Sequence, residues 1–179
     1  MKNFVLVDFM GSGKSAIGRR IAKQLNLRFL DMDAEIEQRE GYRISEIFSK
    51  EGEARFRVLE RSLARELAKA QDLVIATGGG IVLDPRNLDD LRQSGVIIVL
   101  GVTPETVMKR VGHQTHRPLL ESGDPSKTGL DAVAKREKVE RLLSQRDPIY
   151  RAAGKYITTD DKTLDQVVTE VLAVYQKDV

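Results

Sequence analysis

The stretch Asp8-Phe9-Met10-Gly11-Ser12-Gly13-Lys14-Ser15 decides the fold of this chain. It follows the apolar run 4–7 and precedes residues 17–25, whose apolar side chains recur at helical spacing. A strand, a glycine-rich turn and a helix in this order are typical of a P-loop, where backbone N–H groups and a helix N-terminus hold a polyphosphate. A Gly-Ser-Gly-Lys turn also occurs by chance, but its place between a buried strand and an amphipathic helix favours the P-loop.

The P-loop motif assigns roles to its last residues and reveals one departure. We expect Lys14 to reach the β- and γ-phosphates of a nucleoside triphosphate and the Ser15 hydroxyl to bind Mg²⁺. The motif has glycine where this chain has Asp8. A carboxylate facing a triphosphate would repel it by roughly 3 kcal/mol per pair of unit charges at ~6 Å and an effective dielectric of ~20. We therefore expect the Asp8 side chain to turn away from the phosphates and to pair with a basic residue or cap a neighbouring turn, so that ATP affinity is lowered modestly at most.

The composition predicts an ordinary globular enzyme. The 179 residues suffice for a single domain, 1–179, with a sizeable core. A net charge of +2, no block of basic residues and 5% aromatic residues give no sign of nucleic-acid binding. The absence of cysteine excludes disulfides and cysteine-based catalysis. No signal peptide or membrane span is recognisable, so we expect a cytoplasmic protein without a membrane partner.

The order of apolar segments predicts a doubly wound α/β fold. Continuous apolar runs at 4–7, 73–76 and 96–100 are typical of strands covered on both faces of a parallel sheet, and shorter runs at 28–30 and 156–157 add two strands. Between and after them lie helical periodicities, clearest at 44–48, 59–67 and 164–175. We therefore predict a parallel sheet of about five strands flanked by helices.

One long polar stretch, from 112 to about 130, interrupts this alternation. Its length and its content of Gly, Pro, Ser and His, with Arg117 inside it, favour a functional lid over a surface excursion. His113 and His116 also fall here. They are better read as solvated lid residues than as metal ligands, because no third ligand accompanies them.

Charged and glycine residues that follow the second and third predicted strands point to an acceptor site. Asp31 and Asp33 would project to the same side in strand geometry, one to hold a water of the Mg²⁺ shell and the other to accept a proton. Asp33 could instead cap the next helix. Gly78-Gly79-Gly80 would let backbone N–H groups approach a ligand, although a tight turn also explains it. Arg57 and Arg146 are solvated helix charges or, as guanidinium forks, readers of a carboxylate; Arg57 could also simply pair with Glu60.

In this order the motifs resemble the shikimate kinase family over nearly the whole chain. The resemblance rests on the segments Gly11–Ser15, Leu30–Asp33, Phe56–Glu60, Gly78–Gly80, Arg117–Leu120 and Arg146–Tyr150. The triple glycine and the Arg-Pro-Leu-Leu segment separate this family from nucleotide and gluconate kinases better than the P-loop does. The resemblance implies a P-loop fold like that of nucleoside monophosphate kinases, with a substrate-binding region at about 32–62 and a mobile lid at about 112–130.

The resemblance also implies a reaction and the residues that carry it. ATP would phosphorylate the 3-hydroxyl of shikimate, a step in aromatic amino acid biosynthesis, in a monomer that uses Mg²⁺. The ATP phosphates would bind the loop residues Gly11, Ser12, Gly13, Lys14, Ser15 and Ala16. Asp31 would hold the metal through water, Asp33 would be the candidate base, and Arg117 on the lid would neutralise the transferring phosphoryl group together with Lys14.

The remaining positions carried over from the family concern the two ligands. Arg57 and Arg146 would clamp the carboxylate of shikimate, and Gly79 would offer its backbone to the ring. Arg110 matches the adenine-stacking position, and Lys162 lies near the second adenine loop. The segment between Arg117 and Arg146 is longer than in compact members of the family, so we expect a lengthened helix or lid there.

Two alternatives remain open. The chain could be a related small-molecule kinase for another hydroxy acid, although a pair of arginines at a carboxylate argues against a neutral substrate. It could also be a catalytically silent nucleotide-binding regulator, which only Asp8 supports. The joint presence of the residues Lys14, Ser15, Asp31, Asp33 and Arg117 argues against that reading.

Overall fold

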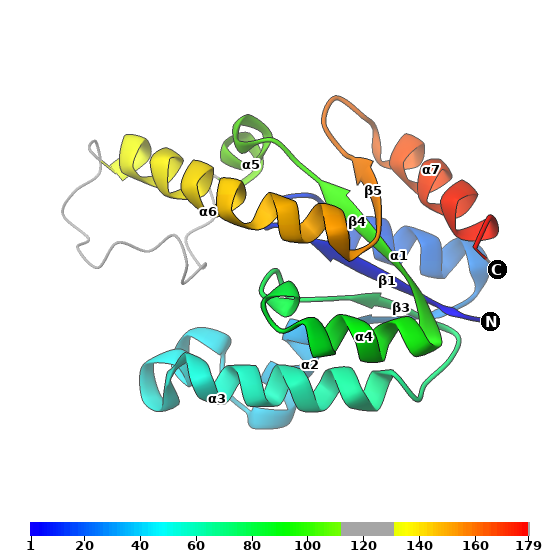
Figure 1. Ribbon diagram of the computed structural model, residues 1–179, viewed down its shortest axis with the longest axis horizontal. Coiled ribbons are helices and arrows are strands. Elements are labelled where there is room, and N and C mark those ends of the chain that lie inside the picture. Colours follow the sequence, from blue (N-terminus) through cyan, green and yellow to red (C-terminus); the bar gives the residue numbers. More distant parts are fainter. Residues whose placement is uncertain (112–130, 179) are drawn as a thin grey trace.

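The computed structural model describes residues 1–111 and 131–178 as alternating strands and helices (Figure 1). In chain order the elements are β1 (Asn3–Asp8), α1 (Lys14–Leu25), β2 (Arg28–Asp31), α2 (Met32–Glu40), α3 (Ile44–Leu67), β3 (Leu73–Ala76), the short 3-10 helix η1 (Ile81–Leu83), α4 (Pro85–Ser94), β4 (Gly95–Gly101), α5 (Pro104–Val111), α6 (Asp131–Ala153), β5 (Lys155–Thr158) and α7 (Leu164–Gln176). The predicted strands all lie where the apolar runs placed them.

The strands form one parallel, five-stranded sheet in the order β2-β3-β1-β4-β5. The longest pairing joins β1 to β4, with Asn3 opposite Gly95 and Asp8 opposite Leu100. This confirms the predicted doubly wound α/β class. Because β1 is central and its neighbours β3 and β4 come much later in the chain, the loop that follows β1 opens where the strand order reverses, which is where such sheets bind ligands.

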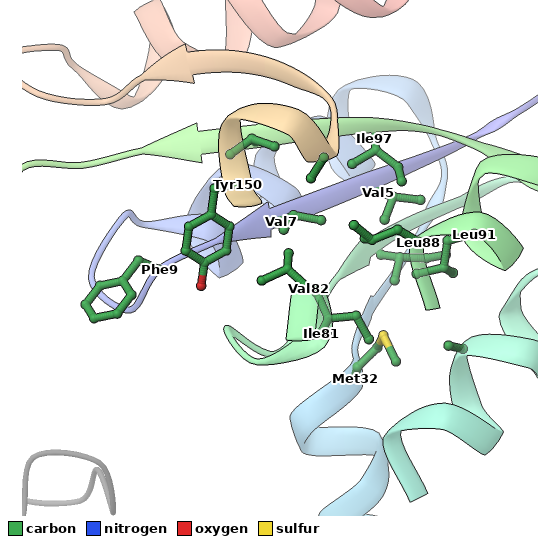
Figure 2. Close-up of a cluster of buried hydrophobic side chains, with 14 of the residues drawn as sticks. Val5, Val7, Phe9, Met32, Ile81, Val82, Leu88, Leu91, Ile97 and Tyr150 are labelled. Carbon is green, nitrogen blue, oxygen red and sulfur yellow. The ribbon is translucent and has the colours of Figure 1, made fainter. Parts of the chain in front are cut away.

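Alternate residues of β1 pack on opposite faces of the sheet, as the period of two requires. Phe4 and Leu6 join a cluster with α1 and α7. Val5 and Val7 belong to the larger cluster with α3, α4 and α6, which also holds Tyr150 (Figure 2). The sheet is therefore covered by helices on both faces (Figure 1). Asp8 is the last residue of β1, and its side chain contacts Ser12 and Lys14 of the glycine-rich loop.

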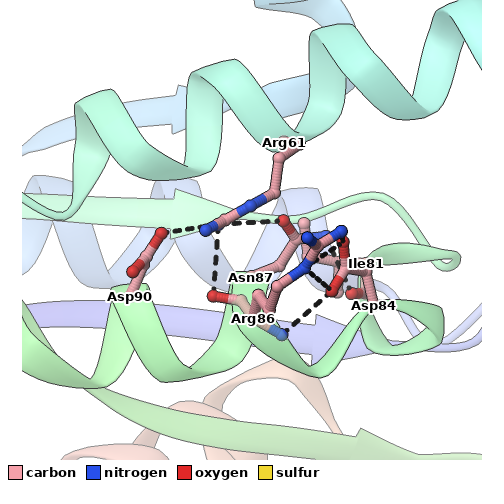
Figure 3. A network of polar contacts seen from close by, with 6 residues as sticks. All are labelled: Arg61, Ile81, Asp84, Arg86, Asn87 and Asp90. Carbon is pink, nitrogen blue, oxygen red and sulfur yellow. Dashed lines mark hydrogen bonds and ion pairs between the residues drawn. The ribbon is translucent and has the colours of Figure 1, made fainter.

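A polar network fixes α3 against α4 (Figure 3). The Arg61 guanidinium on α3 pairs with Asp90 at 2.5 Å and donates to the backbone oxygen of Arg86 at 3.2 Å. The buried Asn87 side chain donates to the Ile81 carbonyl at 3.2 Å. The network thus ties the helix that carries Arg57 to the segment that follows the three glycines.

The structure differs from the sequence-based prediction at Asp33. Strand β2 ends at Asp31, whose carboxylate accepts hydrogen bonds from the backbone N–H groups of Asp33 and Ala34 and so caps α2. The prediction that Asp31 and Asp33 share one side of a strand is wrong, because the cap turns the chain into a helix after Asp31. The alternative that Asp33 is the cap is wrong too.

Two predictions concern the rest of the chain. The predicted lid, 112–130, with Arg117, His113 and His116, lies outside the described residues. The extra length before Arg146 is helical where it is described, because α6 runs from Asp131 to Ala153. Within the ranges 1–111 and 131–178, no helix is both long and apolar enough to cross a membrane.

Candidate active site

The loop between β1 and α1 has the backbone of an anion-binding turn. Gly11 and Gly13 adopt φ angles of 86° and 89°, a left-handed conformation that glycine tolerates and other residues rarely adopt. Gly13 is the N-cap of α1 and has no side chain to satisfy the first N–H groups of the helix. These donors and the positive end of the helix dipole are therefore available to a phosphate group.

The Asp8 carboxylate lies beneath this loop and is almost fully buried. One of its oxygens is 3.0 Å from the Lys14 ammonium, and the other accepts a hydrogen bond from the Ser12 hydroxyl. The expected pairing of Asp8 with a basic residue is confirmed, and the partner is Lys14 of the glycine-rich loop itself. The Asp8 carboxylate, at the first position of the motif, thus contacts both Ser12 and Lys14 further along it.

Lys14 is held as a cation by its surroundings. Burial alone would favour the neutral amine, but Asp8 first, then Asp33 and Asp31, offset it, so that the pKa of Lys14 is raised. The nearby carboxylates therefore favour the charged ammonium over the neutral amine. It lies among three carboxylates at the mouth of the loop.

Ser15 and Asp31 meet at the first turn of α1. The Ser15 hydroxyl donates to Asp31 at 2.9 Å. A hydroxyl and a carboxylate are hard oxygen ligands, which Mg²⁺ prefers, and Mg²⁺ normally keeps several waters. The pair therefore fits a magnesium ion bound by Ser15 directly and by Asp31 through water. No group of three or more acidic or histidine side chains that would form a protein-only metal site occurs among the described residues.

Asp33 projects from the first turn of α2 toward the glycine segment. A Cβ atom at Gly78 would lie 2.6 Å from an Asp33 carboxylate oxygen and 3.1 Å from one of Glu60, so only glycine leaves room for both. Burial raises the pKa of Asp33, Lys14 counteracts this, and the nearby carboxylates add to it. A carboxylate shifted toward neutral pH beside a buried cation suits a general base.

Arg57 on α3 reaches the same segment from the other side. Its guanidinium donates to the buried Glu60 at 2.7 Å and to the exposed Glu53 at 2.8 Å. A Cβ atom at Gly80 would lie 2.3 Å from a nitrogen of the Arg57 guanidinium, so a side chain there would displace this guanidinium, although the φ of −92° is ordinary. The alternative prediction, a pair between Arg57 and Glu60, is confirmed. The Arg57 guanidinium nevertheless also lies against the glycine segment.

Tyr150 brings α6 to the middle glycine. Its hydroxyl donates to the Gly79 carbonyl at 2.5 Å, and its ring packs in the core beside Val7 and Val82 (Figure 2). Burial raises the pKa of Tyr150, while Arg146, one helical turn earlier, lies near the hydroxyl and lowers it. The structure therefore places Arg146 on the same side as Gly79, together with the phosphate loop and the glycine segment.

Arg110 and Lys162 differ in how closely they approach the loop. The Arg110 guanidinium donates to the carbonyls of Gly11 and Ser12, both at 3.2 Å, and to Thr159 at 3.1 and 3.2 Å. Lys162 pairs with Glu170 of α7 at 2.7 Å instead. Arg110 thus lies against the glycine-rich loop, and the contact described for Lys162 turns it toward α7.

Three residues of the site had no predicted role. Glu60 and Tyr150 were quoted as parts of motifs, and their spacing to Arg57 and Arg146, three and four residues, was the available signal. Thr159 directly follows a short strand, where polar residues commonly line the carboxyl edge of a parallel sheet. Nothing in the sequence indicated that Tyr150 would reach the Gly79 carbonyl or that Thr159 would reach the Gly101 carbonyl.

Comparisons with known proteins agree with this geometry. The family model described as shikimate kinase matches residues 10–176. A shikimate kinase of Caldanaerobacter subterraneus subsp. tengcongensis is 40% identical over 99% of this chain and 98% of its own length, and that of Pelotomaculum thermopropionicum is 42% identical over 96% and 94%. The structure of the shikimate kinase from Acinetobacter baumannii in complex with shikimate superposes with a TM-score of 0.88 at 34% identity, over 99% of this chain and 94% of that one.

Proposed function

Because the chain belongs to the shikimate kinase family, we propose that it transfers the γ-phosphoryl group of ATP to the 3-hydroxyl of shikimate, giving ADP and shikimate 3-phosphate. The observation that carries the proposal is the meeting of three groups at the carboxyl edge of the sheet. The Lys14 ammonium, the partly buried Asp33 carboxylate and the Arg57 guanidinium all lie against the phosphate loop or the glycine segment.

Phosphoryl transfer needs positioning and charge neutralisation more than covalent help from the protein. The N–H groups at the start of α1 and Lys14 would hold the β- and γ-phosphates in line with the acceptor. Asp33 would accept the proton of the attacking hydroxyl, and Lys14 nearby would keep that carboxylate oriented. Arg117, from the segment 112–130, would complete the neutralisation of the transferring group as a lid closes.

Ser15 and Asp31 would hold Mg²⁺, which would neutralise charge on the phosphate groups. The 2.9 Å contact between their side chains supports this, because it brings a hydroxyl oxygen and a carboxylate oxygen together. The phosphate loop, Gly11 to Ala16, would enclose the rest of the triphosphate. Arg110 would support that loop and stack on adenine, and Lys162 would lie at the far side of the base.

The carboxylate of shikimate would be read by two guanidinium groups. Arg57 lies beside Gly80, and Arg146 lies beside the Tyr150 hydroxyl that binds Gly79. Since Tyr150 occupies the Gly79 carbonyl, the backbone N–H of that residue is the group left for the substrate ring. We also propose a single domain, 1–179, that acts as a monomer in the cytoplasm, where ATP is supplied.

The test is release of ADP from ATP and Mg²⁺ with and without shikimate. We expect turnover that depends on shikimate, that is lost in Asp33→Asn, and that the methyl ester of shikimate cannot support. Arg57→Met should raise KM for shikimate at least about tenfold, the loss of roughly one charge-assisted contact. Arg65→Met is the matched control, because it removes an exposed arginine two turns later on the same helix, outside the Arg61 network. ATP binding without any stimulation by shikimate would contradict the proposal.

A further inference from the structure

Asp8 is the point at which this chain departs from the P-loop motif. Its side chain contacts Lys14 and Ser12, two residues of the motif itself. The residue is 2% exposed, at the end of the central strand β1. Its carboxylate is 3.0 Å from Lys14 and accepts the Ser12 hydroxyl. A buried charge persists only when it is paired and hydrogen-bonded. The Asp8 carboxylate therefore uses the two side chains of the loop that would otherwise face the phosphates.

We propose that Asp8 is a positioning residue for Lys14. Its carboxylate pairs with the Lys14 ammonium until a nucleotide binds, and it makes nucleotide binding depend on the metal that neutralises the phosphates. The inference rests on the proposed function only in that a nucleotide must bind this loop. It follows from the geometry, because a ligand phosphate and Asp8 have to share one ammonium group.

The charges around Lys14 explain why the metal matters. Asp8, Asp31 and Asp33 all act on this single cation. With glycine at position 8, one of these negative charges would be absent. The repulsion that Asp8 adds grows with the negative charge of the ligand. It is therefore small for a nucleotide whose phosphates carry Mg²⁺ and larger for the same nucleotide without the metal.

The test compares ADP binding with and without Mg²⁺, measured by calorimetry at one fixed ionic strength so that screening is equal. Asp8→Asn keeps the shape and an acceptor for the Ser12 hydroxyl but removes the charge. If it strengthens binding of Mg²⁺-ADP by about threefold, it should strengthen metal-free ADP by about thirtyfold, because metal-free ADP carries two more negative charges. Asp8→Gly restores the motif and should also strengthen the binding of metal-free ADP more than that of Mg²⁺-ADP. It replaces Asp8→Asn in the test if Asp8→Asn does not fold.

Asp72→Asn is the matched control. It removes one carboxylate at the opposite end of β1, where Asp72 pairs with the exposed amino terminus at 2.7 Å, and it should leave both affinities unchanged.

A role of Asp8 in loop structure alone gives a different result. Both affinities would then change by the same factor, within about twofold, or both would fall. Either outcome overturns the proposal. The assay contains no shikimate. An unchanged ratio of the affinities for metal-free ADP and Mg²⁺-ADP therefore overturns the role of Asp8 and leaves the proposed function standing. Failure of the native protein and of every variant to bind ADP overturns both.

Discussion

At the scale of single residues, the site is a set of buried charges that stabilise one another. Lys14 and Asp8 form a pair in which the side chains are 14% and 3% exposed. Breaking such a pair by removing one partner leaves the other charge uncompensated, which costs far more than the net worth of the pair. The stability of the phosphate loop and its chemistry therefore depend on the same two side chains.

Lys14→Met tests this coupling. We expect it to abolish turnover and to lower the free energy of unfolding by about 3 kcal/mol, because Asp8 stays buried without its cation. Adding Asp8→Asn should recover most of that loss without restoring turnover. Urea unfolding at pH 7.5 measures both values. A double variant no more stable than Lys14→Met would show that the pair contributes nothing to folding.

Glu60 gives a pH dependence whose sign can be worked out. Burial, only partly offset by Arg57, raises the pKa of Glu60 from 4.5 to about 7. The folded protein therefore binds this proton more tightly than the unfolded chain does. The stabilising contribution is present in full below pH 4.5 and is lost as the pH rises through about 7.

Glu60→Gln removes this titration. The unfolding free energy of the native protein minus that of Glu60→Gln should fall by about 3 kcal/mol between pH 4.5 and pH 7.5. Glu53→Gln is the control, because it removes an exposed carboxylate that binds the same guanidinium at 2.8 Å. Denaturant unfolding at several pH values provides the comparison. A difference that rises with pH would show that Arg57 outweighs burial.

At the scale of secondary-structure elements, the acceptor site depends on how α3, α6 and the glycine segment meet. The Arg61 network fixes α3 relative to η1 and α4, and the Tyr150 hydroxyl fixes α6 relative to Gly79. The two elements that carry arginines are thus anchored independently on one backbone segment. The distance between these two elements determines which carboxylate ligand the two arginines can bind together.

Tyr150→Phe tests the anchor of α6. Loss of the 2.5 Å hydrogen bond should lower the free energy of unfolding by about 1 kcal/mol and raise KM for shikimate several-fold, with KM for ATP unchanged. Tyr175→Phe removes a hydroxyl of matched geometry, which donates to the Lys2 carbonyl at 2.5 Å on a different part of the molecule. It should cost similar stability and leave KM alone. Equal kinetics in the two variants would mean that Tyr150 does not position the site.

The sequence predicted elements well and their junctions less well. The strands were visible because strands buried on both faces are continuous apolar runs, and the phosphate loop because its glycines have a fixed spacing. Asp33 was misplaced because the spacing of the residues does not reveal that the Asp31 side chain caps the backbone. This cap decides that the chain continues after residue 31 as a helix and not as a strand. The contact of Tyr150 with Gly79 joins segments 71 residues apart, and no local pattern encodes it.

At the scale of the whole molecule, the sheet order places the proposed nucleotide and acceptor regions at different points of the carboxyl edge of the sheet. The phosphate loop leaves the central strand β1, while Asp33 and the three glycines follow β2 and β3, which lie on one side of it. Arg110 and Thr159 approach the loop from the side of β4 and β5. Two ligands can therefore bind side by side, each with its own set of charges.

This arrangement predicts that the two ligands stabilise the fold separately. A ligand at one hundred times its Kd adds about 2.7 kcal/mol to the free energy of unfolding, so Mg²⁺-ADP and shikimate should each raise the melting temperature of the native protein in one cooperative transition. Arg57→Met should lose the shift caused by shikimate and keep that caused by the nucleotide, and Lys14→Met should do the reverse. Scanning calorimetry on both variants checks this. If Arg57→Met lost both shifts, the two regions would have to form one inseparable site, because in the described part of the chain Arg57 contacts Glu53, Glu60 and the glycine segment.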